Sequence, residues 1–218
     1  MAGIEYRPEI DGLRAFAVIP VILFHFGADW IPGGFVGVDV FFVISGFLIT
    51  SILKRDLENG TFSIRDFWAR RIRRILPAMI FVTACTLAVS HAFVFRPEQL
   101  KIGEQALASV LSLANVYFWR HTGDYWGTEA EQSPFLHAWS LSVEEQFYLF
   151  FPCILWLIYR YRPRWLQGFV LAGIVGSLAL FLWGVEAHPT ATFYLLPTRI
   201  WELGAGSLLG LRKCPIDC

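Results

Sequence analysis

Long apolar blocks follow one another along this chain and constrain its fold more than any other feature. A helix that crosses a membrane needs about 20 consecutive, mostly apolar residues. Seven blocks approach this length: Leu13–Gly27, Phe35–Leu53, Ile75–Phe95, Ile102–Trp119, Val143–Tyr159, Leu166–Val185 and Phe193–Leu211. They predict an all-α fold, a polytopic bundle of helices embedded in a lipid bilayer.

The composition excludes several other classes of protein. Hydrophobic residues make up 56% of the 218 residues and charged residues only 17%, where a soluble domain carries about 25%. That balance excludes a disordered chain, a coiled coil and a nucleic-acid-binding module. The chain is too short to bury so much apolar surface in a soluble core. Its apolar residues also do not alternate as they do in an outer-membrane barrel.

Basic residues orient the chain, because cytoplasmic loops carry an excess of Lys and Arg. Three basic clusters lie at Lys54–Arg74, Arg160–Arg164 and Arg212–Lys213, and we expect all three to be cytoplasmic. An even number of crossings must then separate the first two clusters. The third and fifth blocks supply two, so we expect the fourth, Ile102–Trp119, to be a re-entrant or interfacial helix. The resulting topology has about six spanning helices and a cytoplasmic N-terminus.

Arg14 and His25 lie eleven residues apart in the first block. At about 100° per residue they project from the same face of a helix, about 16 Å apart along its axis. Ionisable groups inside a bilayer are costly and usually mark function, so both are candidate catalytic residues. The alternative is that Arg14 extends to the membrane interface and that His25 only packs between helices.

Asp39 is the single charged residue of the second block and lies at a depth comparable with that of His25. A carboxylate beside His25 would orient the imidazole and raise its basicity. Alternatively, Asp39 only stabilises the first turn of its own helix through the helix dipole.

Four arginines, Arg70, Arg71, Arg73 and Arg74, precede the third block. The simpler interpretation is that they anchor the chain on anionic lipid, at about 1 kcal/mol per basic residue. The more specific interpretation is a site for a phosphorylated donor, because guanidinium groups bind phosphate through paired hydrogen bonds.

The densest polar stretch is residues 137–148, at the start of the fifth block. Ser142-x-x-Glu145 has the pattern of a capping box, which predicts that a helix begins there with two glutamates in its first turn. The capping box does not explain why His137 lies at the same depth, on the outer side to which His25 points. Glu144 and His137 are therefore further candidate catalytic residues.

Together these motifs resemble those of the acyltransferase 3 family of membrane O-acyltransferases. The motifs that carry the resemblance are Tyr6–Ala15 followed by His25, Gly37–Thr50, Phe67–Pro77 and His137–Tyr148. They occur in the family's order, and the resemblance extends to about Leu211. We therefore expect residues 1–211 to form an acyltransferase 3-like transmembrane domain, incomplete at its C-terminus, and residues 212–218 to form a short cytoplasmic tail.

The resemblance implies an activity and a location. Family members are bacterial inner-membrane proteins that transfer acyl groups, commonly acetyl, to hydroxyls of cell-surface sugars. The implied donor is acyl-CoA, and the implied acceptor is a surface or lipid-linked glycan. No permanently bound cofactor is implied, and the cysteine spacing indicates no metal site.

The resemblance also implies roles for individual residues. It makes Arg14 and His25 the counterparts of the family's essential Arg–His pair, and the four arginines the counterparts of its cytoplasmic arginine motif. His25 would then be the general base, oriented by Asp39 or Glu144. Arg14 would position the donor or neutralise charge that develops on the thioester.

Two other functions compete with acyl transfer. Family domains usually have about ten spans, so this chain would be an inactive fragment or a subunit that needs a partner to supply the remaining spans. A polytopic transporter is the second alternative, although the two halves of the chain show no inverted repeat.

Overall fold

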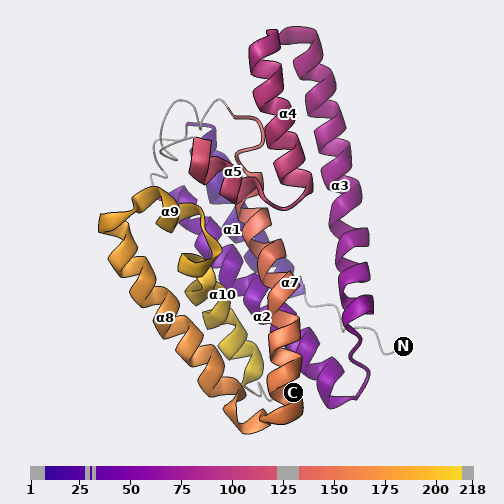
Figure 1. The fold of residues 1–218 in the computed structure, drawn as a ribbon, viewed down its shortest axis with the longest axis vertical. Helices are drawn as coiled ribbons and strands as arrows, with labels where there is room; N and C mark the ends of the chain where they lie inside the picture. Colours follow the sequence, from indigo (N-terminus) through magenta and orange to yellow (C-terminus); the bar gives the residue numbers. More distant parts are fainter. Residues whose placement is uncertain (1–7, 28–29, 31–32, 122–132, 213–218) are drawn as a thin grey trace.

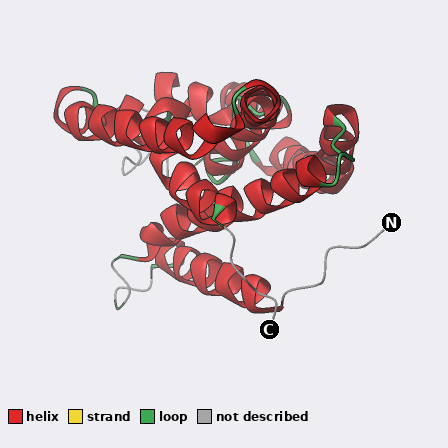
Figure 2. Ribbon diagram, turned by 90° about the horizontal axis from the view of Figure 1, so that it is seen from below, coloured by secondary structure: helices red, strands yellow, loops and turns green. Residues whose placement is uncertain are grey.

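The computed structural model describes residues 8–27, 30, 33–121 and 133–212. Tyr6 and Arg7 of the first motif, and the expected tail beyond Arg212, lie outside the described residues. The elements are α1 (Pro8–His25), η1 (Gly34–Val36), α2 (Gly37–Glu58), α3 (Ile64–Phe93), α4 (Arg96–Val110), α5 (Ala114–His121), α7 (Ala138–Tyr161), η2 (Pro163–Trp165), α8 (Leu166–Ala187), α9 (Pro189–Tyr194) and α10 (Leu196–Leu211). The described part of the chain contains helices and loops but no strand (Figure 2), which confirms the all-α prediction.

Within the described ranges, four helices are long and apolar enough to cross a membrane: Gly34–Glu58, Ile64–Phe93, Ala138–Tyr161 and Pro163–Ala187. They correspond to the second, third, fifth and sixth apolar blocks, and they make this chain a helical membrane protein. The other two expected crossings, through α1 and α10, stay predictions. Helix α1 carries Glu9, Asp11 and Arg14, and α10 has only 16 residues.

The fourth apolar block does not form one continuous helix. It is divided into α4 and α5 at Ser112, whose φ of 56° lies in the left-handed region. The N–H of Leu113 donates to the carbonyl oxygen of Ala108, and that of Ser112 to Ser109. This pair of hydrogen bonds is the Schellman motif, which ends a helix and is usually built on glycine. The seventh block is likewise divided, into α9 and α10, at the extended residue Leu195.

Helix α7 begins at Ala138, four residues before the serine that we expected to cap it. The hydroxyl of Ser142 donates to the Ala138 carbonyl oxygen (2.9 Å) and accepts a hydrogen bond from the N–H of Ala114 (3.2 Å). The predicted capping box is therefore wrong. Ser142 instead satisfies an N–H in the first turn of α5, a group that has no partner within its own helix.

Helix α10 lies between α2 and α8 (Figure 1) and packs against both. Its contact with α2 depends on glycine, since a Cβ at Gly46 would meet the Leu203 carbonyl oxygen and one at Gly206 the Val43 carbonyl oxygen. Small residues of this kind allow two helix backbones to approach closely. Helix α1 packs against α2, and α3 and α4 lie side by side (Figure 1).

Candidate active site

His25 and His137 line one cavity with a volume of about 630 Å³. His25 is the last residue of α1, and His137 immediately precedes α7. The two imidazoles are close enough to interact electrostatically. Trp139 and Ser140, from the first turn of α7, line the same cavity. The fold thus brings together two histidines that the sequence singled out separately.

A backbone carbonyl orients the His25 ring. Nδ1 of His25 lies 2.8 Å from the carbonyl oxygen of Val21, one turn earlier in α1. Because a carbonyl oxygen can only accept, Nδ1 carries the proton and Nε2 is the unprotonated, basic nitrogen of the neutral imidazole. This tautomer suits a general base that acts through Nε2.

The surroundings of His137 favour its neutral form. Desolvation in the cavity lowers the pKa of His137, and the neighbouring His25 lowers it further, while a hydrogen bond to the Pro134 backbone raises it. The lowering effects prevail, because desolvation of the charged imidazolium is the largest of the three causes. At neutral pH the cavity therefore offers a neutral imidazole next to His25.

Arg14 lies among residues of α2 and α7 at a different depth. Its guanidinium carbon is 5.6 Å from the ring centroid of Phe41, and it interacts electrostatically with Glu144. Glu144 is 5% exposed and accepts a hydrogen bond from the Tyr148 hydroxyl at 3.3 Å. Arg14 and Glu144 thus form a second polar group, about 16 Å along α1 from His25.

The four arginines of α3 have different surroundings. Arg71 packs its guanidinium carbon 4.9 Å from the ring centroid of Tyr148. Arg70 pairs with Asp56 at 3.4 Å. Arg73 and Arg74 are exposed and form no ion pair with the described residues. One arginine therefore faces the bundle, and three lie on the surface of the first turns of α3.

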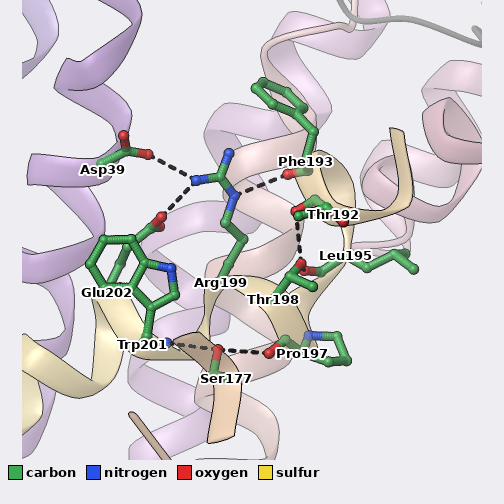
Figure 3. Close-up of polar contacts among 10 residues, drawn as sticks. All are labelled: Asp39, Ser177, Thr192, Phe193, Leu195, Pro197, Thr198, Arg199, Trp201 and Glu202. Atoms are coloured by element: carbon green, nitrogen blue, oxygen red, sulfur yellow. Dashed lines mark hydrogen bonds and ion pairs between the residues drawn. The ribbon is translucent and has the colours of Figure 1, made fainter. Parts of the chain in front are cut away.

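Asp39 pairs with Arg199 rather than with a histidine. Nη1 of Arg199 lies 3.1 Å from Asp39 Oδ1 and 2.6 Å from Glu202 Oε1 (Figure 3). Neither Asp39 nor Glu144 has a hydrogen bond or ion pair to His25 among the described residues. The expectation that one of these carboxylates orients His25 is therefore wrong, because the Val21 carbonyl occupies that position.

The sequence motifs predict no role for the Arg199–Glu202 pair. Both residues lie in the seventh apolar block, and they are 6% and 1% exposed. The available signal was their spacing of three residues, which places opposite charges on one helix face within an apolar segment. Their partner Asp39 lies 160 residues earlier, so spacing alone does not identify it.

Comparisons with known proteins agree with the sequence motifs. The sequence model of the acyltransferase domain family Acyl_transf_3 matches residues 7–213. The chain is 36% identical over 210 residues to O-acetyltransferase OatA of Staphylococcus aureus strain NCTC 8325, covering 94% of this chain and 34% of the relative. It is 38% identical over 211 residues to peptidoglycan O-acetyltransferase OatA of Listeria monocytogenes, covering 94% of this chain and 34% of the relative.

A third relative is a putative O-acetyltransferase, SAS0844, from Staphylococcus aureus strain MSSA476. It is 34% identical over 216 residues, covering 97% of this chain and 35% of the relative. The chain thus spans about a third of the length of these curated relatives. No solved structure matches it.

Proposed function

Since this chain belongs to the acyltransferase family whose model matches residues 7–213, we propose that it takes part in O-acetylation of a cell-surface carbohydrate. The relatives named O-acetyltransferase support the acetyl group, and the one named peptidoglycan O-acetyltransferase supports a cell-wall glycan as acceptor. Residues 1–211 would act as a single transmembrane domain. The observation that carries the proposal is the cavity that His25 and His137 share.

His25 is the proposed general base. Its Nε2 takes the proton of the acceptor hydroxyl while the hydroxyl oxygen attacks the acyl carbonyl carbon. The carbon–sulfur bond of a thioester donor then breaks, and the departing sulfur takes the proton from His25 and leaves as the thiol. A positioned base typically accelerates such a step by about 10²–10⁴-fold. His137, held neutral beside it, shares the proton or binds the hydroxyl.

Acyl-CoA is the proposed donor, bound from the cytoplasmic side. Arg70, Arg73 and Arg74 are surface cations on the first turns of α3, and arginine binds phosphate through paired hydrogen bonds. Arg14 lies about 16 Å along α1 from His25. Its proposed role is therefore to position the donor as it enters from the cytoplasmic side, not to assist His25 directly. Glu144 holds Arg14 in place through their electrostatic attraction.

The proposed location is the bacterial inner membrane, with the N-terminus in the cytoplasm. The basic clusters support this orientation through the positive-inside rule. It places the arginines on the side where acyl-CoA is made and the two histidines toward a surface or lipid-linked glycan.

The test is acetyl transfer from labelled acetyl-CoA to cell-wall glycan by membranes that contain the chain. Replacement of His25 by Ala is expected to lower the rate by about 10²–10⁴-fold. His91→Ala is the matched control, because His91 is an exposed histidine near the end of α3 and does not line the cavity. Full activity of His25→Ala would remove the proposed base.

A further inference from the structure

A second cavity, of about 620 Å³, adjoins the histidine cavity. Val38 and Trp139 line both cavities, so the Trp139 side chain lies between them. The second cavity also contains Asp39, Arg199 and the aromatic side chains of Phe181 and Phe193. None of these four residues lines the histidine cavity.

Arg199 presents one guanidinium nitrogen without a hydrogen bond to the described residues. Nε donates to the Phe193 carbonyl oxygen at 3.1 Å, and Nη1 is engaged by Asp39 and Glu202 (Figure 3). The remaining nitrogen, Nη2, is a donor on a side chain that is only 7% exposed. Because Arg199 lines the cavity, this donor is available to a ligand atom that accepts a hydrogen bond.

Asp39 supplies an acceptor next to that donor. Only its Oδ1 is bonded to Arg199, and its side chain is 35% exposed at the cavity. A donor and an acceptor side by side match a hydroxyl group, which both accepts and donates. They match a phosphate less well, because the one arginine is already countered by Asp39 and Glu202.

Aromatic rings surround this polar pair. The guanidinium carbon of Arg199 lies 5.1 Å from the ring centroid of Phe193, 5.8 Å from that of Trp139 and 5.9 Å from that of Phe181. Their apolar faces suit the C–H face of a sugar ring, while the hydroxyls at its edge need polar partners. Pockets that combine apolar walls with a few placed polar groups are typical ligand sites.

We propose that this second cavity is the acceptor subsite, which holds a neutral sugar ring with a hydroxyl between Asp39 and Arg199. The inference rests on the proposed acetyl transfer, and it gives Asp39 a binding role in place of orienting His25. A sugar held here lies across Trp139 from the two histidines, so the neighbouring residue of the glycan reaches the first cavity.

The test measures binding of tritiated triacetylchitotriose, a neutral oligosaccharide, to the full chain in lipid nanodiscs. Asp39→Asn keeps the size of the side chain but removes its charge, and is expected to weaken binding about tenfold or more. Val185→Trp fills the cavity from a position that is 46% exposed and is expected to weaken binding similarly without disturbing the ion pairs. A hundredfold excess of inorganic pyrophosphate should not displace the sugar.

Ser177→Ala is the matched control. It removes hydrogen bonds between Ser177 Oγ and residues of α10, at the Pro197 carbonyl and the Trp201 N–H, outside the cavity (Figure 3). Binding should be unchanged in this variant. Unaltered binding in both Asp39→Asn and Val185→Trp, failure of the wild-type chain to bind, or displacement by pyrophosphate would overturn the subsite.

The two proposals fail in different ways. If the wild-type chain binds the trisaccharide and both variants weaken binding, but no acetyl transfer occurs, the subsite stands and the proposed function falls. If acetyl transfer depends on His25 while binding is indifferent to Asp39 and Val185, the subsite falls and the proposed function stands.

Discussion

The guanidinium carbon of Arg71 lies 4.9 Å from the ring centroid of Tyr148, which joins the start of α3 to the middle of α7. The neighbouring Trp68 reinforces this contact, because its indole Nε1 donates to the Tyr148 carbonyl oxygen at 3.2 Å. Arg71 also interacts electrostatically with Glu144 and Glu145. It is therefore a structural member of an arginine cluster whose other members lie on the surface.

This difference predicts that alanine substitutions at Arg71 and Arg73 have different effects. Arg71→Ala is expected to lower the free energy of unfolding by about 1–2 kcal/mol, since cation–π contacts reach that size when desolvated. Arg73→Ala removes an exposed cation and is expected to change it by no more than about 0.5 kcal/mol. Unfolding in detergent micelles measures both. Equal losses of stability would contradict the division of the cluster.

The close contact between α2 and α10 predicts a strong effect of one added methyl group. Gly206→Ala places a Cβ against the Val43 carbonyl oxygen, and such overpacking is expected to lower the free energy of unfolding by about 1–3 kcal/mol. Gly176→Ala, on α8, is the control, because nothing lies within 4 Å of its added Cβ. Alanine favours the helix there by up to about 1 kcal/mol. Comparable stability of the two variants would show that the helices separate easily.

A buried amide pair predicts energetic coupling between α5 and α7. Asn115 is fully buried, and its side chain exchanges hydrogen bonds with that of Gln146 at 2.8 Å and 3.3 Å. Each single alanine variant removes the side-chain partner of the other amide, although Asn115 Nδ2 still donates to the Tyr194 carbonyl oxygen and Gln146 Nε2 to that of Ser112. The effects of the two substitutions are therefore not additive. A double-mutant cycle should give a coupling of about 0.5–3 kcal/mol. Additive losses would mean that the two amides contribute independently.

The sequence predicts the apolar helices well and their polar partners poorly. Residues 166–185 contain no charged residue, and α8 covers Leu166–Ala187. His25, a candidate catalytic residue within the first apolar block, lines a cavity. These features are local, so the sequence determines them directly.

The errors concern contacts between distant segments. Ser142 has the spacing of a helix cap, but a loop residue, His137, already precedes the helix, and the serine serves Ala114 of α5. From its position in the second apolar block, Asp39 is expected at the same depth as His25. It instead forms an ion pair with the buried Arg199 of α10. In both cases a residue far along the chain competes for the polar group, and periodicity within one segment contains no information about it.

The cavity histidines predict how the free energy of unfolding depends on pH. The pKa of His137 lies below its ordinary value of 6.5 because of desolvation and the nearby His25. The unfolded chain therefore binds the proton first, and acidification from pH 7 through 6.5 is expected to lower the free energy of unfolding. Above that range, both states carry the neutral imidazole and this contribution to stability is fully present.

The His25→Asn variant separates the two causes of the lowered His137 pKa, which are desolvation and the neighbouring His25. The variant removes the ionisable ring whose protonated form repels a proton on His137, but it leaves the desolvation. The pKa of His137 is therefore expected to rise toward 6.5 without reaching it. Titration of histidine ring resonances by NMR measures this shift without any need for activity. His91→Asn, at an exposed position of α3 that does not line the cavity, is the control and should leave the His137 titration unchanged. A His137 pKa that does not respond to His25→Asn would mean that the two rings do not share one electrostatic environment, and the proposed base would then act without its neighbour.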